Sequence, residues 1–105
     1  MTAQPAPKPR LGGALERGAA EELARALRAV ADPTRLQILS IILGSADERA
    51  TVGQLADTLG LRQPTVTHHV RILLDDGFVT RVQDGKLGWI SVHPERRAAV
   101  EDFLR

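Results

Sequence analysis

The sequence has no cysteine among its 105 residues. This absence excludes a disulfide framework and any metal site built from thiolates, and it fits a reducing cytoplasm. The sequence also has no apolar run near the about 18 residues that a transmembrane helix needs. Its N-terminus lacks the apolar core of a signal peptide. We therefore expect a cytoplasmic protein that does not enter a membrane.

The sequence also lacks a large excess of positive or negative charge: its formal net charge is only +1. This balance excludes a non-specific polycation, so any binding to nucleic acid must come from a local basic patch. The chain is short and 43% hydrophobic, which predicts one small domain with a modest core. A domain of this size often completes its core by dimerising.

Residues 51–79 carry the clearest structural pattern. The hydroxyl of Thr51 is suited to cap a short helix over 53–59, and Gly60 can end that helix in the left-handed conformation. A second helix is expected over 63–76, with a proline in its first turn, where the missing N–H costs little. Two helices joined by so short a turn make a helix-turn-helix, and the second helix is the candidate reader of DNA.

The second helix has two distinct faces when its residues are placed at about 100° intervals. Its predicted buried stripe comprises Val66, His69, Val70 and Leu73. Its outward face and first turn carry groups that can hydrogen-bond to base edges and phosphates. We expect these DNA-binding residues to be Gln63, Thr65, Thr67, His68 and Arg71.

A β-hairpin is expected directly after the helix-turn-helix. Residues 78–82 and 87–92 alternate as strands do, and an Asp-Gly turn signal lies between them. A helix-turn-helix followed by a hairpin is a winged helix. The tip of this wing would present Arg81, Gln83 and Lys86 to phosphates beside the second helix.

The two ends of the chain differ in character. Residues 1–13 contain three alternating prolines and little to bury, so we expect a flexible tail, with 14–105 forming the folded domain. A helix is expected over 14–31 and another from Asp32 to Gly44, followed by a polar loop over 45–50.

The last predicted helix, 95–105, is too short to bury its apolar side alone. It would pair with the first helix across a dimer axis. The residues expected at this dimer interface are Leu15, Ala19, Leu23, Val100, Phe103 and Leu104.

Three runs of the sequence together resemble the ArsR/SmtB family of bacterial winged-helix repressors. They are LRAVADPTRLQILSIIL, TVGQLADTLGLRQPTVTHHVRILLDDGFV and RVQDGKLGWISVHPE, and the resemblance covers about Leu23 to Glu95. It implies a mainly α fold with a β-hairpin wing, in the order α-α-α-α-β-β-α. It also implies a homodimer that binds an imperfect palindrome in a promoter and represses transcription. By matching position, the DNA-reading residues are those already named on the second helix, with 81–86 as the wing.

The metal sites that many members of this family carry are not recognisable here. The start of the third helix, residues 51–55, has no cysteine, and Pro94 and Arg96 stand where an Asp and a His are expected in the last helix. The chain also ends before a second His pair could occur. A different site for a divalent metal such as nickel or zinc could combine residues of both subunits. Its candidate ligands are His93, Glu95, Glu101 and Asp102.

Three function classes compete for this sequence. An enzyme needs a nucleophile with a positioned base or paired carboxylates in a cleft. The histidines and serines here fall at the DNA face, the wing end and helix termini, so we expect no enzyme. An alternative is a co-regulator that depends on a partner protein to sense its effector, such as a metal. A pure protein-interaction module would expose apolar anchors on the second helix. That face carries Thr67, His68 and Arg71 instead, which favours a DNA-binding regulator.

Overall fold

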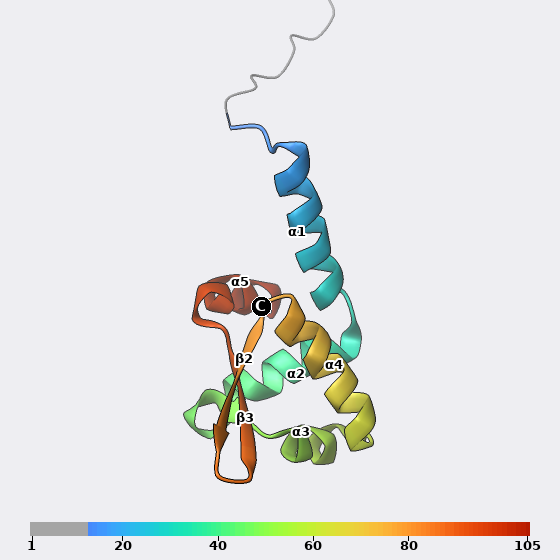
Figure 1. The fold of residues 1–105 in the computed structure, drawn as a ribbon, viewed down its shortest axis with the longest axis vertical. Coiled ribbons are helices and arrows are strands. Elements are labelled where there is room, and N and C mark those ends of the chain that lie inside the picture. The colour runs from blue at the N-terminus through green and yellow to red at the C-terminus, as the bar shows by residue number, and fades with distance from the viewer. Residues whose placement is uncertain (1–12) are drawn as a thin grey trace, which may run out of the picture.

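Five helices and three strands follow one another along residues 13–105, the part of the chain that the structure, a computed structural model, describes (Figure 1). The predicted tail lies outside the described residues, apart from Gly13. Two 3-10 turns, η1 and η2, separate some of the elements. In chain order the elements are α1 (Arg17–Val30), α2 (Pro33–Gly44), η1 (Ala46–Glu48), β1 (Arg49–Ala50), α3 (Val52–Leu59), α4 (Gln63–Asp75), β2 (Val79–Asp84), β3 (Leu87–Val92), η2 (Pro94–Arg96) and α5 (Arg97–Phe103).

The three strands form one antiparallel sheet in the order β1-β3-β2. Strands β2 and β3 make the predicted hairpin, whose pairs run from Val79 with Val92 to Asp84 with Leu87. The expected winged helix-turn-helix is therefore confirmed, and it has one additional strand. The expectation of a plain loop over 45–50 was wrong, because Arg49 and Ala50 pair with the free edge of β3.

The helix-turn-helix is fixed by local signals at its ends. The Thr51 hydroxyl accepts a hydrogen bond from the Gln54 N–H at 3.1 Å, and the Gln54 side chain accepts one from the Thr51 N–H at 3.0 Å. This reciprocal cap satisfies two of the donors that a helix start leaves free. Gly60 then ends α3 with a φ of +67°, a conformation that costs glycine little.

Two predicted helices begin later than their sequence pattern indicated. Helix α1 starts at Arg17 and not at residue 14, so Leu15 precedes it. Helix α5 starts at Arg97, because residues 94–96 form the 3-10 turn η2. Pro94 is the first residue of η2, where its fixed φ suits a helical conformation and its missing N–H costs little.

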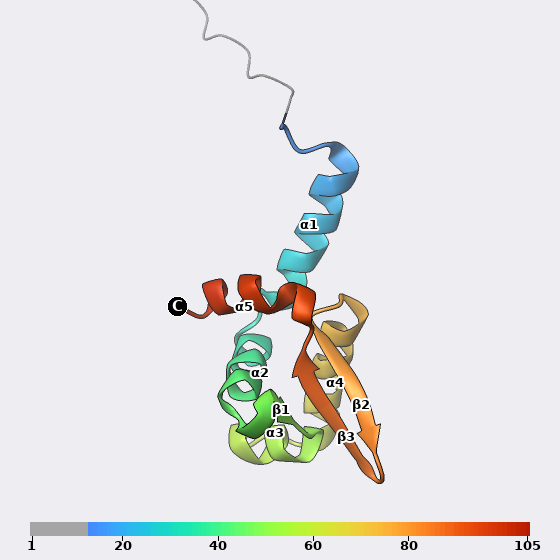
Figure 2. The ribbon, with the colours of Figure 1, turned by 90° about the vertical axis from the view of Figure 1, so that its left-hand side faces the viewer.

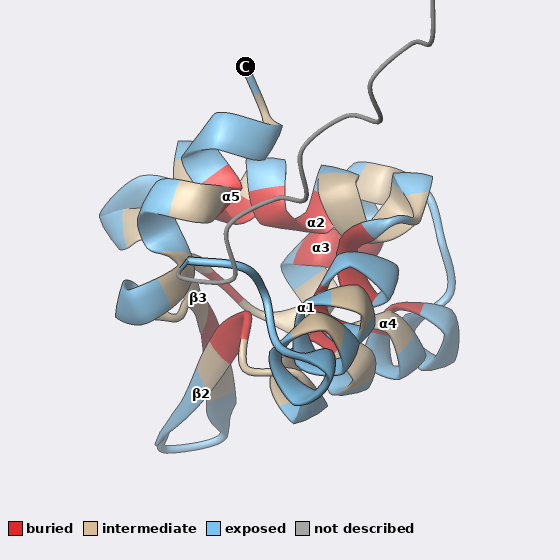
Figure 3. Cartoon of the chain, turned by 90° about the horizontal axis from the view of Figure 1, so that it is seen from above, coloured by how far each residue is buried: buried red, intermediate tan, exposed pale blue. Residues whose placement is uncertain are grey.

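Helix α2 runs through the middle of the core and packs against its neighbours on several sides. Ile38, Leu39 and Ile42 are fully buried, and its remaining apolar residues are half-buried against the same cluster. Figure 3 shows the buried positions gathering where α2, α3, α4 and α5 meet. Among the described residues no polar side chain is buried. This apolar packing holds α3, α4 and the wing in fixed relative positions.

The ends of the molecule are set apart by this arrangement. Helix α1 projects away from the body, and α5 lies across the end of the core from which α1 rises (Figures 1 and 2). The tip of the wing lies at the opposite end, near α3. The fold thus separates one end built from the first and last helices from another built from α3, α4 and the wing.

Asp32 caps α2 by accepting a hydrogen bond from the Arg35 N–H at 2.9 Å. Replacing Asp32 with alanine is expected to lower the free energy of unfolding by about 1 kcal/mol. Replacing it with asparagine, which caps equally well, should cost less. Urea titrations at one protein concentration measure both differences.

The pH dependence of this cap has a defined direction. The backbone N–H of Arg35, followed by the charges of Arg35 and His69, holds the pKa of Asp32 below its ordinary value. A lowered folded-state pKa gives stability that is present above the unfolded pKa and is lost as pH falls through the folded one. The stability difference between wild type and Asp32→Asn should therefore shrink below about pH 4. If the stability difference stays the same below this pH, the negative charge of Asp32 does not contribute to the cap.

Candidate nucleic-acid interface

Helix α4 presents a polar face to solvent and an apolar face to the core. Val66 and Leu73 are fully buried and Val70 is nearly so. The five residues expected to bind DNA are all exposed, namely Gln63, Thr65, Thr67, His68 and Arg71. The first turn of α4 contains no acidic residue, so its N-terminal partial positive charge is left available to an anion.

A hollow of about 350 Å³ joins the starts of α3 and α4 to the wing. It brings together three of the predicted residues, Gln63, Arg81 and Lys86. The other lining residues, which the sequence interpretation did not assign to DNA binding, are Thr51, Val52, Gly53, Leu87 and Gly88. Two cations beside a helix N-terminus make a site whose charge and N–H groups suit a phosphate.

The guanidinium of Arg81 lies over Gly88 and is held by hydrogen bonds within the wing. It donates to the Gln83 side-chain oxygen at 3.2 Å, and Gln83 donates in turn to the Gly85 carbonyl at 3.1 Å. A Cβ atom at Gly88 would lie only 2.6 Å from the Arg81 Nε. Glycine at 88 therefore provides the space that Arg81 occupies, and Gln83 acts in this structure by fixing Arg81.

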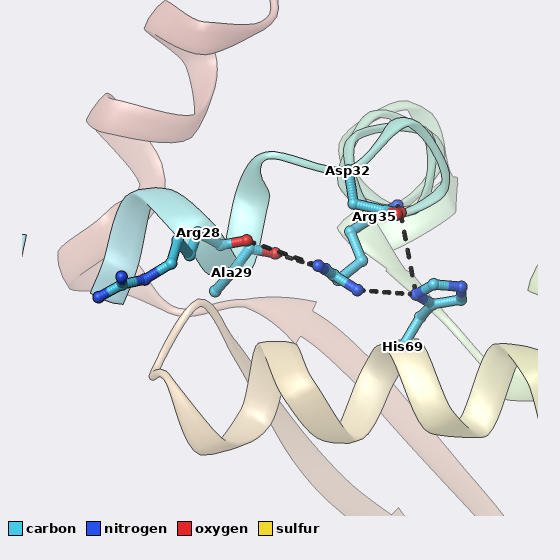
Figure 4. A network of polar contacts seen from close by, with 5 residues as sticks. All are labelled: Arg28, Ala29, Asp32, Arg35 and His69. Carbon is cyan, nitrogen blue, oxygen red and sulfur yellow. Dashed lines mark hydrogen bonds and ion pairs between the residues drawn. The ribbon is translucent and has the colours of Figure 1, made fainter. Parts of the chain in front are cut away.

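One member of the predicted buried stripe does more than pack. His69 is half-buried, and its Nδ1 lies 3.1 Å from the Arg35 Nη1 (Figure 4). The same guanidinium donates to the Ala29 carbonyl at 2.5 Å and to the Arg28 carbonyl at 3.5 Å. Arg35 thus connects the end of α1 to α4. The sequence interpretation missed this role, and its only signal was Arg35 inside the Asp-Pro-Thr-Arg motif.

Comparison with known proteins agrees with this geometry. A profile described as a helix-turn-helix domain matches residues 30–82, just over half of the chain. A probable mercury resistance operon repressor of Streptomyces lividans is 44% identical over 63 residues, which are 60% of this chain and 48% of the repressor. An arsenical resistance operon repressor of Staphylococcus aureus is 29% identical over 85 residues, which are 81% of this chain and 76% of that protein. The chain belongs to the ArsR/SmtB family.

A solved structure shows the same fold over nearly the whole chain. It is a homodimeric winged helix-turn-helix DNA-binding domain from Mycobacterium bovis, described as a possible ArsR-family transcriptional regulator. Its TM-score is 0.72 at 23% identity, and the match covers 99% of this chain and 86% of that one. The ArsR/SmtB-family chain described here spans about half the length of the mercury repressor.

The first and last helices of this ArsR/SmtB-family protein leave large apolar side chains in solvent. Leu23 and Leu27 of α1 are 48% and 47% exposed, and Phe103 of α5 is 41% exposed. Leu15, before α1, is 59% exposed, Ala19 is also exposed and Leu104 is half-buried. Val100, by contrast, has no exposed surface. Val100 packs in the chain's own core, so it cannot contact a partner subunit directly and can only hold α5 in position.

Helix α5 is tied to the α2–β1 connection by an ion pair. Arg97 contacts both carboxylate oxygens of Glu48, one of them at 2.7 Å. These hydrogen bonds hold the pKa of Glu48 below its ordinary value and raise that of Arg97. Glu48 and its neighbour Asp47 both have positive φ, at +52° and +55°. The contact with Arg97 helps to hold this unusual backbone.

Within one subunit the four candidate metal ligands are not gathered into a site. The His93 Nδ1 accepts from the Glu95 N–H at 3.1 Å and so caps η2. Glu101 pairs with Arg97 at 2.8 Å, and Asp102 with Arg105 at 3.6 Å. Within residues 13–105 no group of three or more histidine, cysteine or acidic residues is placed to hold a metal ion.

None of the described helices has both the length and the hydropathy to cross a membrane.

Proposed function

We propose that this protein is a sequence-specific transcriptional regulator that binds a palindromic promoter operator as a homodimer and represses transcription. The observation that carries the proposal is the continuous surface formed by the exposed face of α4 and the cationic hollow beside it. On this surface Thr67, His68 and Arg71 face outward from one helix, and Arg81 and Lys86 stand beside its start.

The two parts of this surface serve different purposes. Helix α4 is the element that enters a major groove, where Gln63 and Thr65 in its first turn reach base edges. The hollow takes a backbone phosphate, and Arg81 and Lys86 supply charge that is independent of sequence. The wing therefore fixes the register on the duplex while the helix reads the bases.

Dimerisation follows from the other end of the molecule. The exposed leucines of α1 and the exposed Phe103 of α5 form an apolar surface that a second copy would cover. The homodimeric domain from Mycobacterium bovis supports this arrangement by its fold. Two copies related by a two-fold axis present two α4 helices to one face of the duplex, and this symmetry calls for a palindromic site. A dimer seated on a promoter would block transcription by occupying it.

The effector is a separate part of the proposal. The relatives are named for mercury and arsenical resistance, but the candidate ligands of this chain are engaged in local contacts. We therefore assign the signal to a ligand other than a metal held at these residues, or to a partner protein. Nickel, zinc, mercury and arsenite are added in the binding experiment, and release of DNA by any one of them would overturn this assignment.

Selection from a pool of random double-stranded DNA tests the function. The protein should enrich an imperfect palindrome whose half-sites lie about one helical turn or more apart. Binding to that sequence should weaken steeply as salt is raised, because phosphate contacts release counterions. A pool that remains random after several rounds, with a folded protein, would refute sequence-specific binding.

Gly88→Ala isolates the part played by Arg81. The new Cβ would displace the guanidinium, the flexible end of a side chain, so the fold should be retained. Operator affinity should then fall about tenfold per dimer, as it should for Arg81→Ala. Gly44→Ala is the matched control, because its Cβ meets nothing within 4 Å. A Gly88→Ala protein that binds like wild type, while Arg81→Ala does not, would show that the observed placement of Arg81 is unimportant.

A further inference from the structure

We infer that His69 is a positioning residue for α4, the recognition helix that is proposed to read DNA. Its neutral imidazole accepts a hydrogen bond from Arg35. Protonation of the ring exchanges this contact for one with Asp32 and weakens operator binding. The inference rests on the proposed function, since it concerns how α4 is held for DNA. It adds a control by pH that arises where the end of α1 and the start of α2 meet α4.

The first step is the protonation state that the geometry requires. A guanidinium has only donors, and the Arg35 Nη1 lies 3.1 Å from the His69 Nδ1. The Nδ1 must therefore carry a lone pair, which places the proton of the neutral ring on Nε2. Arg35 is itself fixed, because it also donates to the Ala29 and Arg28 carbonyls at the end of α1.

The second step is the alternative partner. The Asp32 Oδ2 lies 3.9 Å from the same His69 Nδ1 (Figure 4). One nitrogen cannot accept from Arg35 and donate to Asp32 at once, and the shorter distance favours the first arrangement. Once Nδ1 is protonated it becomes a donor facing a cation, and the Asp32 carboxylate, 3.9 Å away, is an acceptor within its reach. The ring therefore has two mutually exclusive partners.

The charges around the ring set the direction of this exchange. Arg35 and Asp32 face it from α2, and the His68 ring lies 5.7 Å away on α4 itself. From α1 the Ala29 and Arg28 carbonyls accept from Arg35, and the Arg28 guanidinium points away from the ring (Figure 4). A protonated His69 is repelled by Arg35 and attracted by Asp32, so it moves from the first partner to the second.

The third step connects the ring to DNA binding. The His69 side chain is only 16% exposed. Because most of it contacts protein and not water, a change of its hydrogen-bond partner alters the packing of its neighbours. His69 is adjacent to His68 and two residues from both Thr67 and Arg71, all on the exposed face of α4. Arg35 joins this helix to the end of α1, whose leucines form the proposed dimer surface. Loss of the Arg35 contact loosens α4 from that support.

The bond itself is tested on the free protein. Nitrogen-15 spectra of the histidine rings at about pH 8, above the range in which histidine ordinarily gains its proton, report which nitrogen carries the proton. We expect His69 as the Nε2–H tautomer, and we expect the Arg35→Lys variant to lose this preference. A His69 that carries its proton on Nδ1, or that is doubly protonated at this pH, would overturn the inference. No DNA is needed, so this result is independent of the proposed function.

The effect on binding is tested with two variants. The Asn oxygen in His69→Asn can replace Nδ1 as an acceptor but does not titrate, whereas His69→Leu removes the acceptor. At about pH 8, His69→Asn should bind the selected operator within about threefold of wild type, and His69→Leu about tenfold more weakly. The ratio of the wild-type Kd to the His69→Asn Kd should rise about tenfold as pH falls to about 5.5.

The ratio is used because both proteins retain His68 and His93, so that a pH effect arising at these residues is common to both. Circular dichroism at each pH establishes that both remain folded. Parallel pH profiles for wild type and His69→Asn would overturn the inference even if the operator is bound tightly. If the selection yields no operator, the proposed function and the regulatory part of the inference both fail, while the tautomer measurement still decides the Arg35 contact.

Discussion

Replacing both Leu23 and Leu27 with glutamate is expected to convert the dimer into monomers and to weaken operator binding by at least about 100-fold. These leucines are about half exposed on one side of α1. In a two-fold interface each substitution enters twice, so four carboxylates would be buried close together without partners. A monomer carries one recognition helix, and it loses the gain in affinity that comes from engaging two half-sites with one molecule.

Sedimentation velocity and an operator titration on the same samples measure this effect. Phe103→Glu should act in the same direction, because its ring is 41% exposed on α5. Arg17→Glu is the control, since Arg17 begins α1, lies about 100° around the helix from these leucines, and pairs with Glu21 at 2.9 Å. A stable dimer in the Leu23 and Leu27 double variant would place the subunit interface elsewhere.

Arg71→Ala is expected to lower operator affinity by about 1–3 kcal/mol per subunit if the guanidinium reads a guanine. In that case the preference at one base pair of each half-site should also relax. If Arg71 contacts phosphate, all sequences should lose affinity together, and the salt dependence should fall by about one charge per subunit. Titrations against matched and mismatched duplexes at several salt concentrations separate these two results.

The control for this prediction is Arg17→Ala, which removes the same charge at the far end of α1 from the recognition helix. It should leave affinity and salt dependence unchanged. If Arg71→Ala behaves like this control, Arg71 is not in the interface, and the exposed face of α4 is turned differently on the duplex.

The helix-turn-helix and the wing were predictable because short-range signals fix them. Thr51 caps α3, Gly60 ends it, Pro64 stands in the first turn of α4, and Gly85 turns the hairpin with a φ of +60°. Each of these effects acts over a few residues, so the pattern of the chain is sufficient to locate them.

The parts that could not be predicted depend on residues far apart in the sequence. Strand β1 exists because Arg49 and Ala50 meet β3 about forty residues later. Val100 is buried because the core reaches under α5, although helical spacing alone grouped it with Phe103. The contact between Arg35 and His69 joins positions 34 residues apart, and no local pattern indicates that these two side chains meet.

The candidate site shows the same division. The exposed face of α4 follows from its period, so its five polar residues could be named in advance. The hollow beside it needed the structure, because it combines the start of α3 with both strands of the wing. Glycine at position 88 has meaning only once Arg81 is seen to occupy the space over it.

Hydroxyl-radical footprinting of the protein on its selected DNA tests the central claim most directly. A dimer that places one α4 helix in each of two major grooves predicts two protected segments related by a dyad, about one helical turn or more apart. The wings predict further protection of the flanking backbone, which the Arg81→Ala variant should lose. A single protected segment bound by one copy of the chain would contradict the account.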